Sequence, residues 1–509
     1  MPHSSDRSRR MPGPVSSVLL AGLVAAMLAP AAPAAGQEAT PAQEAAPAVR
    51  NAPPSFADLA EAQMDAVVFI STTQARPKTG PRGQDLPEVP PGSPFEEFFR
   101  EFRDRQNGPQ RQPPATALGS GFIIDPAGYV VTNGHVVADA DEISVTLHDG
   151  TKLPAKLVGS DAPTDLALLK VETAHPLTAA RWGDSDRLNV GDWVVAIGNP
   201  FGLGGSVTAG ILSARARDIQ QGPYDDYLQT DASINRGNSG GPLYDMDGTV
   251  VGINTAIYSP TGGSVGIGFA IPSAIARPVI EQLREQGKVR RGWLGVQVQQ
   301  VTPDIAESLG MAEPKGALVI SVSPEGPAGK AGVRQGDIIL RFDGRGIEDM
   351  RQLPRTVAAT RIGSEVPLDL LREGKPLTVM VTVGELEPQP QVAAAGSSGD
   401  AGPSAAADSR TVLGLTLSPL TPGLREAFAI NPDVEGVVVT EVGERSPASE
   451  RGIEAGDVIV EAAQEAVRTP EELDRRVRQA REQGRKTVLM LVRRDGDLRY
   501  VPVPVEEKG

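Results

Sequence analysis

Short β-rich runs fill the chain between Gly119 and Ile271, and they limit the possible folds more than any other feature of the sequence. Glycine and aspartate separate the runs, and no long helical period appears before about Ala274. Many short strands without alternating helices are typical of antiparallel barrels or sandwiches. The sequence therefore predicts a mainly β fold for this part of the chain. The runs cover residues 121–124, 129–131, 143–147, 166–169, 193–197, 250–253 and 267–271.

Composition excludes several classes of protein. The 509 residues carry a formal net charge of −15, and no cluster of lysine or arginine stands out. Because phosphate neutralisation needs clustered positive charge, the sequence predicts no nucleic-acid partner and at most a weak association with membranes. The chain has no cysteine, which excludes disulfides, thiolate zinc sites, iron–sulfur clusters and cysteine nucleophiles.

The first 36 residues have the features of an export signal. Three arginines precede an apolar run at 15–28, and small residues at 31–36 offer cleavage sites. As a helix, the apolar run would reach only about 21 Å, short of the roughly 30 Å hydrocarbon core of a membrane. We therefore expect a cleaved signal peptide and a periplasmic protein, with an uncleaved inner-membrane anchor as the alternative. Residues 37–54 are rich in alanine, proline and glutamine, and we expect them to be disordered.

The segment before the β-rich region contains a long insertion. Residues 56–64 predict a short helix and residues 66–70 a strand. Residues 75–116 are then broken up by proline, glycine, arginine and glutamine, and a long insertion of this kind is usually functional or mobile. The aromatic cluster inside it, at 95–102, is either a contact surface or a partly buried turn.

Two later segments repeat one another, which indicates tandem small domains. Residues 316–339 and 436–459 share an apolar strand, a Pro-Ala pair and a Gly-Asp pair followed by a second strand. Between the two domains, residues 387–410 are rich in alanine, glycine, serine and proline. A coil of this length averages roughly 25–30 Å between its ends. We therefore expect a flexible linker that tethers the last domain loosely.

The strongest signal for chemistry is Gly237-Asn238-Ser239-Gly240-Gly241. A serine hydroxyl becomes a nucleophile when a neighbouring base takes its proton, and flanking glycines let backbone N–H groups face an oxyanion. The bare pattern also fits the nucleophile elbow of α/β-hydrolases, in which the histidine follows the serine. All four histidines precede Ser239, which excludes the α/β-hydrolase order. The order His, Asp, Ser remains, in the β-rich context of a chymotrypsin-like double barrel.

His135 and Asp165 are the candidates for the base and for the acid that orients it. His135 follows a strand at a point where a helical turn could begin, whereas His148 and His175 fall in a turn and a loop. The N-terminal histidine leaves with the leader. Asp165 stands at the mouth of an apolar strand, where a carboxylate must be hydrogen bonded. Asp161 is the alternative acid, unless it is only a turn residue. The alternative for His135 is a histidine buried in the core.

Five motifs in this order resemble the high-temperature-requirement (HtrA or Deg) family of serine proteases. They are residues 119–125, 132–136, 165–170, 198–202 and 237–242. The resemblance covers nearly the whole mature chain. It implies a chymotrypsin-like double β-barrel protease domain followed by two small α+β PDZ domains. The expected limits are 55–282 for the protease domain, 286–386 for the first PDZ domain and 411–506 for the second.

The resemblance also implies roles for single residues. His135 would be the general base, Asp165 would orient it, and Ser239 would attack the scissile carbonyl carbon. The backbone N–H groups of Gly237 and Ser239 would form the oxyanion hole, with Asn238 as a further candidate.

Specificity follows in part from the same resemblance. Ser233 occupies the position at which trypsin-like enzymes have an acidic residue, so cleavage after lysine or arginine is not expected. Ile234 and the stretch Thr255-Ala256-Ile257 resemble the lining of the substrate pocket and imply small or medium aliphatic residues. The alternative is that these are strand-core side chains. One departure is Gly134, where the family usually has asparagine, and this change would loosen the turn.

Regulation is the last property that the resemblance implies. Arg217 resembles the start of a sensor loop that runs through Tyr224 and Tyr227 and couples PDZ occupancy to the active site. Trp293-Leu294-Gly295-Val296 and Val412-Leu413-Gly414-Leu415 each place backbone N–H groups where they can meet a peptide C-terminal carboxylate. The adjoining strand edge would then accept the peptide as an added strand.

Two absent motifs narrow the function further. No G-x-x-x-x-G-K-[ST] phosphate loop and no H-E-x-x-H pair occur, so we expect neither ATP-driven unfolding nor a zinc site, and no cofactor. The sequence then predicts an exported, ATP-independent serine endopeptidase for misfolded envelope proteins, and the resemblance implies trimers or multiples of trimers. The alternative, from another class, is a chaperone or PDZ scaffold that kept the fold without the activity.

Overall fold

A computed structural model gives the fold of the chain. It describes residue 53 and residues 55–73, 116–198, 205–235, 237–259, 263–387 and 409–505. The expected leader, nearly all of the segment at 37–54, the aromatic cluster at 95–102 and most of the linker at 387–410 lie outside these residues. Within these ranges, no helix is long and apolar enough to cross a membrane.

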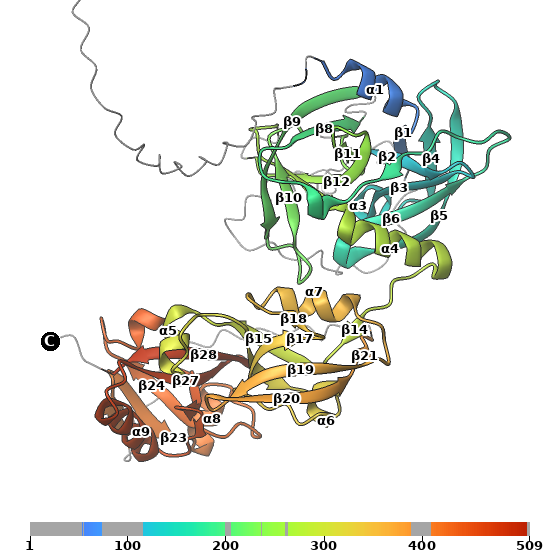
Figure 1. The fold of residues 1–509 in the computed structure, drawn as a ribbon. Coiled ribbons are helices and arrows are strands. Elements are labelled where there is room, and N and C mark those ends of the chain that lie inside the picture. Colours follow the sequence, from blue (N-terminus) through green and yellow to red (C-terminus); the bar gives the residue numbers. More distant parts are fainter. Residues whose placement is uncertain are drawn as a thin grey trace, which may run out of the picture. The chain divides into compact units, whose positions relative to one another are not determined.

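Six strands close a first β-barrel, in the order β1-β2-β3-β6-β5-β4 (Figure 1). The helix α1 (Ala57–Met64) precedes it, as the sequence predicts. Two short helical turns, α3 (Gly134–Val137) and η1 (Ala162–Thr164), connect its strands. The strands are β1 (Val67–Thr73), β2 (Thr116–Asp125), β3 (Tyr129–Asn133), β4 (Glu142–Thr146), β5 (Lys152–Asp161) and β6 (Leu166–Val171).

Strand β6 shows why a continuous apolar run folds here as a strand. Its side chains point alternately to two faces, as in any strand. Leu166 and Leu168 pack into the core that also holds residues of the second lobe, whereas Ala167 and Leu169 pack inside the first barrel. All four are fully buried. Burial on both faces fixes the position of the residue that precedes the strand, Asp165.

A second ring of strands forms the other lobe. The order is β11-β8-β9-β10-β13-β12, the pairing of β11 with β12 closes the ring, and β7 lies parallel to β12 outside it. These two lobes confirm the predicted mainly β, chymotrypsin-like class. The strands are β7 (Arg181–Trp182), β8 (Trp193–Gly198), β9 (Ser206–Arg217), β10 (Tyr227–Thr230), β11 (Pro242–Tyr244), β12 (Thr249–Ile257) and β13 (Gly268–Pro272), with the turn η2 (Ser185–Arg187) between β7 and β8.

The helix α4 (Ser273–Gln286) ends the double barrel. Its apolar residues recur at helical spacing, so Ala276, Val279, Ile280 and Leu283 share one buried face. That face packs against β5, β6 and β12 (Figure 1). The helix therefore holds strands of both lobes together.

Two small domains of similar plan follow. The first has a sheet in the order β15-β16-β17-β19-β20 and a separate pair of β14 with β21. Its elements are β14 (Gly292–Trp293), β15 (Val296–Gln300), α5 (Pro303–Ser308), β16 (Ala317–Val322), α6 (Pro327–Lys330), β17 (Ile338–Phe342), β18 (Arg345–Gly346), α7 (Gln352–Ala359), β19 (Glu365–Arg372), β20 (Lys375–Thr382) and β21 (Gly384–Glu385).

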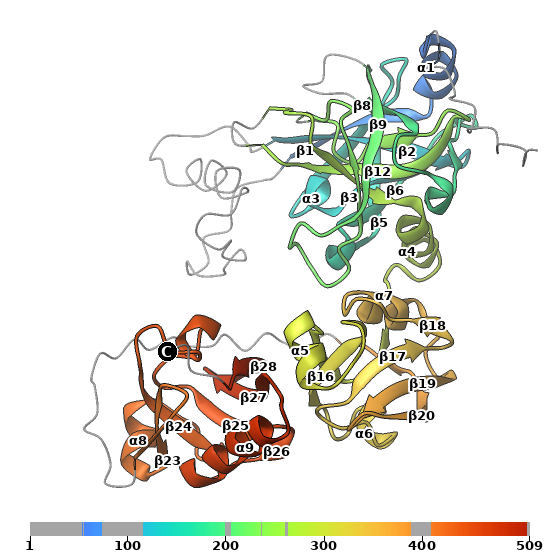
Figure 2. The same ribbon diagram turned by 60° about the vertical axis from the view of Figure 1, so that its left-hand side comes forward.

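The second small domain has the sheet order β22-β23-β24-β25-β27-β28, and its helix α9 lies along this sheet (Figure 2). Its elements are β22 (Arg410–Val412), β23 (Leu415–Pro419), α8 (Pro422–Ala427), β24 (Val437–Val442), η4 (Ser449–Arg451), β25 (Val458–Ala462), β26 (Glu465–Ala466), α9 (Pro470–Glu482), β27 (Thr487–Arg494) and β28 (Asp497–Pro504).

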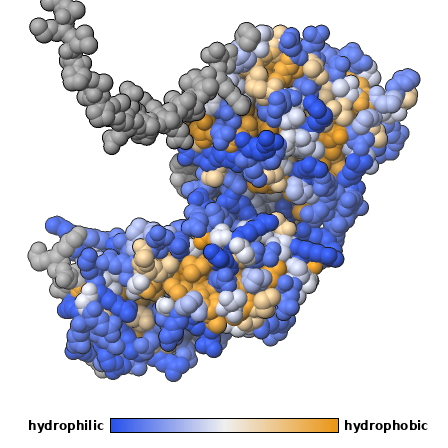
Figure 3. Space-filling view, viewed as in Figure 1, coloured by the Kyte–Doolittle hydropathy of each residue, from blue (hydrophilic) through white to orange (hydrophobic). Residues whose placement is uncertain are grey.

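The two small domains share a hydrophobic cluster. Gln299 supports the contact, because its amide donates to the carbonyl oxygen of Tyr500 and accepts from the Tyr500 N–H, each at 2.8 Å. The buried members of the cluster are Val301, Ile305, Ala306, Leu318 and Ile338 from the first domain and Leu489, Leu491 and Tyr500 from the second. Hydrophilic residues cover most of the face seen in Figure 3, with smaller hydrophobic patches between them.

Candidate active site

His135 and Asp165 meet at the junction of two local structures. His135 lies in the first turn of α3, directly after β3, and Asp165 lies between η1 and β6. The Asp165 backbone has the left-handed φ of 53°, which aspartate tolerates better than most residues. Its carboxylate accepts from the His135 backbone N–H at 2.8 Å, and its Oδ2 lies 2.7 Å from the Nδ1 of the same residue.

A third donor completes the surroundings of this carboxylate. Thr255 Oγ1 donates to Asp165 Oδ2 at 2.8 Å from strand β12 of the second lobe. The carbonyl oxygen of Asp165 accepts in turn from the N–H of Gly134 and from the amide of Asn133. A Cβ at position 134 would lie 3.3 Å from Asp165 Oδ1, so the glycine leaves room for the carboxylate.

The pair shifts the protonation of the imidazole. Burial among surrounding protein atoms would by itself lower the pKa of His135. The negative charge of Asp165 and its hydrogen bond to the ring outweigh that effect, so the pKa of His135 is raised above its usual range. With 45% of the His135 side chain exposed, the other edge of the ring stays accessible.

Ser239 lies in the loop before β11, and several contacts anchor this loop. Its Oγ donates to the carbonyl oxygen of Thr255 at 3.2 Å. Gly237 has a φ of 103° and Gly240 a φ of 84°, which side-chain-bearing residues rarely adopt. A Cβ on Gly240 would also lie 2.3 Å from the carbonyl oxygen of Ser120, so the motif needs glycine there for close approach to β2.

Ser120 is a positioning contact that the sequence reasoning missed, although it lies in the quoted motif 119–125. Its Oγ donates to the carbonyl oxygen of Gly237 at 2.5 Å, and its N–H donates to the carbonyl oxygen of Ser239 at 2.9 Å. Ser120 is fully buried, and Thr132 Oγ1 donates to its carbonyl oxygen. One residue of β2 therefore hydrogen bonds to both Gly237 and Ser239, the two residues whose N–H groups are the expected oxyanion donors.

The expected pocket residues lie beside this loop, but their surroundings differ. Ile234 is 1% exposed and packs in the core of the second lobe, against which Ile257 also packs. Ser233 is exposed, and its carbonyl oxygen accepts from the amide of the buried Asn238 at 3.4 Å. Thr255 is buried and hydrogen bonded to Asp165, whereas Ala256 is half-buried.

Asp161 has a different partner from the one that a catalytic acid needs. It is 6% exposed. Its carboxylate accepts hydrogen bonds from both Nη atoms of Arg291, at 2.7 and 2.6 Å, and from the Thr164 hydroxyl. The interpretation of Asp161 as a mere turn residue is therefore wrong. His148 and His175 are exposed in a turn and a loop, as expected.

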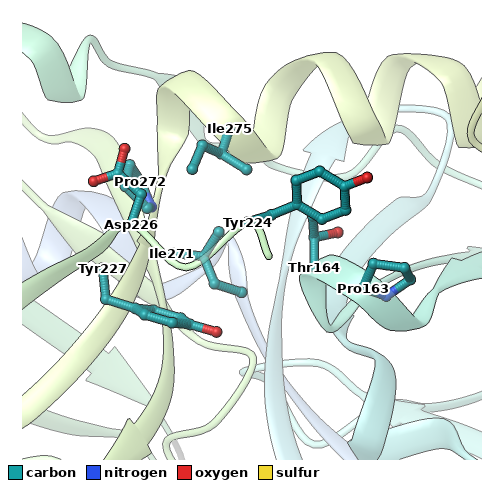
Figure 4. A pocket seen from close by; sticks show the side chains of 8 residues that line it. All are labelled: Pro163, Thr164, Tyr224, Asp226, Tyr227, Ile271, Pro272 and Ile275. Carbon is teal, nitrogen blue, oxygen red and sulfur yellow. The ribbon is translucent and has the colours of Figure 1, made fainter. Parts of the chain in front are cut away.

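The expected sensor loop joins β9 to β10. Arg217 ends β9 and donates from Nε to the Gln229 side chain at 2.8 Å. Tyr224 lies beside Pro163 and Thr164, the two residues that precede Asp165 in the chain. The guanidinium of Arg291 lies 4.8 Å from the centroid of the Tyr224 ring. Figure 4 shows the narrow hollow between these segments, lined by Pro163, Thr164, Tyr224, Asp226, Tyr227, Ile271, Pro272 and Ile275.

The two Leu-Gly motifs of the small domains fall at different structures. Trp293-Leu294-Gly295-Val296 links β14 to β15, and β15 is the end strand of its sheet. Val412-Leu413-Gly414-Leu415 instead forms the turn of a hairpin, because β22 pairs with β23. The described residues contain no group of three or more histidine, aspartate or glutamate side chains that could hold a metal ion.

The chain matches known families in three segments. Residues 119–253 match the trypsin-like peptidase domain, and residues 292–383 and 411–505 each match the PDZ domain. The first and second small domains are thus PDZ domains.

Relatives extend over the whole chain. A probable periplasmic serine endoprotease DegP-like of Rhizobium meliloti (strain 1021) is 44% identical over 97% of this chain and 100% of its own length. A protein with the same description from Brucella suis biovar 1 (strain 1330) is 43% identical over 91% of this chain and 92% of its own. Among solved structures, the HtrA-type protease AlgW with tripeptide is 40% identical over 66% of this chain and 99% of its own, with a TM-score of 0.54. The predicted family is confirmed: the chain belongs to the HtrA proteases, as a DegP-like serine endoprotease with two PDZ domains.

Proposed function

We propose that the chain cleaves unfolded or misfolded polypeptides in the periplasm without ATP, and that His135, Asp165 and Ser239 form its catalytic triad. The observation that carries this proposal is that the Asp165 carboxylate hydrogen bonds to His135 at two places, the backbone N–H and Nδ1. Holding Nδ1 fixes the tautomer in which Nε2 is free to accept a proton.

The proposed reaction starts from the hydroxyl of Ser239. Its proton now points to the carbonyl oxygen of Thr255, so the hydroxyl must turn toward Nε2 of His135. His135 takes the proton as Oγ attacks the scissile carbonyl carbon, and Asp165 stabilises the imidazolium. The N–H groups of Gly237 and Ser239 receive the oxyanion. The imidazolium then protonates the leaving amine, and water releases the acyl group with His135 again acting as base.

Peptide binding is proposed for the first PDZ domain. Residues 293–296 would bind a C-terminal carboxylate, and the free edge of β15 would accept the peptide as an added strand. Two solved HtrA-type relatives contain a tripeptide and a decapeptide, which supports peptide binding by this family. Small or medium aliphatic residues remain the proposed preference of the protease pocket.

Regulation would pass from the first PDZ domain to the sensor loop. Arg351, at the start of α7, forms an ion pair with Asp218 at 2.9 Å, and Arg355 of the same helix pairs with Asp226. Both aspartates belong to the β9–β10 loop, which runs past the segment before Asp165. Movement of α7 on peptide binding would thus act on this loop.

Location and assembly are proposed from the relatives and the sequence. The relatives are described as periplasmic, which supports export through residues 1–36. The family matches at 119–253, 292–383 and 411–505 support the proposed domain limits of 55–282, 286–386 and 411–506. Assembly into trimers or multiples of trimers is proposed from the family resemblance alone.

Replacing the nucleophile tests the proposed activity. The Ser239→Ala protein should lose casein cleavage by roughly a millionfold in kcat, because no other group supplies the attacking oxygen. The matched control is His148→Ala, which removes an exposed histidine and should leave cleavage unchanged. Turnover by Ser239→Ala at the wild-type rate would reject the triad, and absence of cleavage by the wild type would favour the chaperone or scaffold alternative.

A further inference from the structure

The two PDZ domains differ at the strand edge that would receive a peptide. In the first domain, β14 pairs with β21 and leaves β15 as the end of its sheet. In the second domain, β22 pairs with β23 through the register Arg410↔Leu417, Thr411↔Thr416 and Val412↔Leu415. Strand β23 is therefore flanked on both sides, by β22 and by β24.

The connecting turn explains why β22 folds back. Leu413 and Gly414 have φ values of 53° and 78°, and two consecutive left-handed residues are the signature of a tight two-residue hairpin. A Cβ on Gly414 would lie 2.2 Å from the Cβ of Ser446, so only glycine fits at the second position. At the corresponding Leu-Gly position of the first domain, Gly295 has a positive φ of 75° but Leu294 does not, and no hairpin forms between β14 and β15.

Strand β22 also contacts the helix on its other side. It packs against α9, and Arg410 lies 2.9 Å from Asp474 and 4.0 Å from Glu471 of that helix. Val412, the last residue before the turn, is 6% exposed and belongs to the domain core. An extended segment that pairs with the strand after the Leu-Gly turn has the arrangement of a peptide bound by β-strand addition.

We propose that residues 410–412 act as an intramolecular ligand of the second PDZ domain and close its peptide-binding edge. Peptide C-termini then bind the first PDZ domain, and they reach the second only when β22 leaves β23 and α9. The segment has an advantage over free peptide, because a tethered ligand acts at a millimolar effective concentration. The proposal rests on the proposed function only in taking the first domain as the peptide-binding one.

The end of β22 offers the place at which opening can begin. An open hollow of about 610 Å³ lies beside Arg410 and is lined by Ser409, Arg410, Pro419, Thr469 and Glu471. The ion pair of Arg410 is exposed to solvent, since 42% of its side chain is accessible. A change of charge at this residue therefore weakens the hold of α9 on β22 without disturbing the core.

A crosslinking experiment on the full chain tests the proposal. The probe is a synthetic peptide with the sequence of residues 405–412, a free C-terminal carboxylate and a benzophenone group, and the chain carries Ser239→Ala to prevent cleavage. Mass spectrometry then reports whether the probe labels α7 of the first PDZ domain or α9 of the second. We expect the chain with native β22 to be labelled at α7 and not at α9.

Variants open and lock the edge. Arg410→Glu faces Asp474 and Glu471 with like charge and should raise labelling of α9 about 10- to 100-fold, because apparent affinity follows the open fraction. The matched control Arg475→Glu makes the same change at an exposed position of α9 and should leave labelling unchanged. Cysteines placed at Thr411 and Thr416 in the Arg410→Glu chain, which has no other cysteine, should abolish α9 labelling when oxidised and restore it when reduced.

Three results would overturn the proposal. The first is labelling of α9 in the chain with native β22 that equals the labelling in Arg410→Glu. The second is labelling of α9 in the Arg410→Glu chain that does not change when the two cysteines are oxidised. Absence of α9 labelling in Arg410→Glu overturns it as well if hydrogen exchange shows that residues 410–412 have lost protection. Loss of α7 labelling instead counts against peptide binding by the first domain, so the two failures are distinguishable.

Discussion

At the scale of single residues, Asp165 explains most of the geometry of the active site. Its carboxylate accepts from the N–H and Nδ1 of His135 and from the hydroxyl of Thr255. The first two contacts come from helix α3 of the first barrel, and the third comes from the second lobe. The orientation of the imidazole therefore depends on how the two barrels pack together.

Asp165→Asn tests the electrostatic effect of this carboxylate. The general base must be neutral, so kcat/KM of the wild type rises with pH through the raised pKa of His135. In the variant, burial still lowers that pKa while the attracting charge is gone, so the midpoint should move to lower pH. The plateau rate should fall by roughly 10⁴, because the amide no longer holds the required tautomer. A pH profile of peptide cleavage measures both, and a midpoint that moves to higher pH would contradict the assignment.

Ser120→Ala tests the anchor of the oxyanion loop. The variant keeps the backbone bond to Ser239 but leaves the carbonyl oxygen of Gly237 without its hydroxyl donor. This peptide unit can then turn, so kcat should fall about 10- to 100-fold with little change in KM, less than for the loss of an oxyanion donor itself.

The control for that prediction separates positioning from stability. Ser160→Ala removes an exposed hydroxyl from β5 and should change neither constant. Reaction with a fluorophosphonate, measured well below the melting temperature, should slow in parallel with kcat for Ser120→Ala. An unchanged rate of this reaction would make Ser120 a purely structural residue.

The residue scale also shows what sequence alone can supply. The order of the four histidines and one glycine-rich motif indicated Ser239 as the nucleophile of a His, Asp, Ser arrangement, and the positions of His135 and Asp165 next to strands then favoured these two residues. The contacts of Thr255 and Ser120 could not be read, because they join residues 90 and 117 positions apart. Asp161 was misjudged for the same reason, since its partner Arg291 is 130 residues away.

At the scale of elements, the two PDZ domains repeat one buried ion pair. Asp337 and Asp457 are each 1% exposed, and each binds an arginine, Arg372 or Arg494, through both carboxylate oxygens. The Gly-Asp pair of the sequence repeat marks these aspartates. The sequence predicted the repeat from this pair but could not identify the arginines, which lie 35 and 37 residues further on.

Asp457→Ala should therefore destabilise the second PDZ domain. Removing one partner of a buried pair leaves the other charge less well compensated, at a cost of about 3 kcal/mol. This is the lower end of the usual range, because Arg494 is partly exposed and still pairs with Glu454. Calorimetry of the full chain with Ser239→Ala should show a transition of this domain at lower temperature. Asp497→Ala, a change at an exposed position of β28, is the control, and equal melting of both variants would exclude a stabilising role for the pair.

The strands themselves were largely predictable, because alternation and turn residues are local signals. Each of the seven expected runs of the barrel region coincides with a strand, with only residues 147 and 267 one position outside, and the helices near 56–64 and after 274 are present. No local signal, in contrast, could predict how each barrel closes. Pairing of β1 with β4 and of β11 with β12 joins segments that no periodicity connects. The pairing of β22 with β23 was missed because the same Leu-Gly motif serves a loop in one domain and a hairpin in the other.

At the scale of the whole molecule, the composition of the linker at 387–410 does not decide whether the last domain docks. A flexible connection sets only how far a domain can move, while the surfaces decide whether it docks. Ile305 and Leu318 of the first PDZ domain are buried against Leu489, Leu491 and Tyr500 of the second. If either domain stood alone, these apolar side chains would lie on its surface.

Deletion of residues 411–509 separates the two roles of the second PDZ domain. The candidate catalytic residues all lie upstream, so casein cleavage per active site should persist. The same deletion uncovers the apolar face around Ile305, Leu318 and Ile338, so binding of a hydrophobic dye should increase and the protein should associate at high concentration. Adding Ile305→Ser and Leu318→Ser to the truncated chain should reduce dye binding without changing cleavage. Loss of cleavage on truncation would show that the protease domain depends on the second PDZ domain, and unchanged dye binding would show that the shared cluster does not exist in solution.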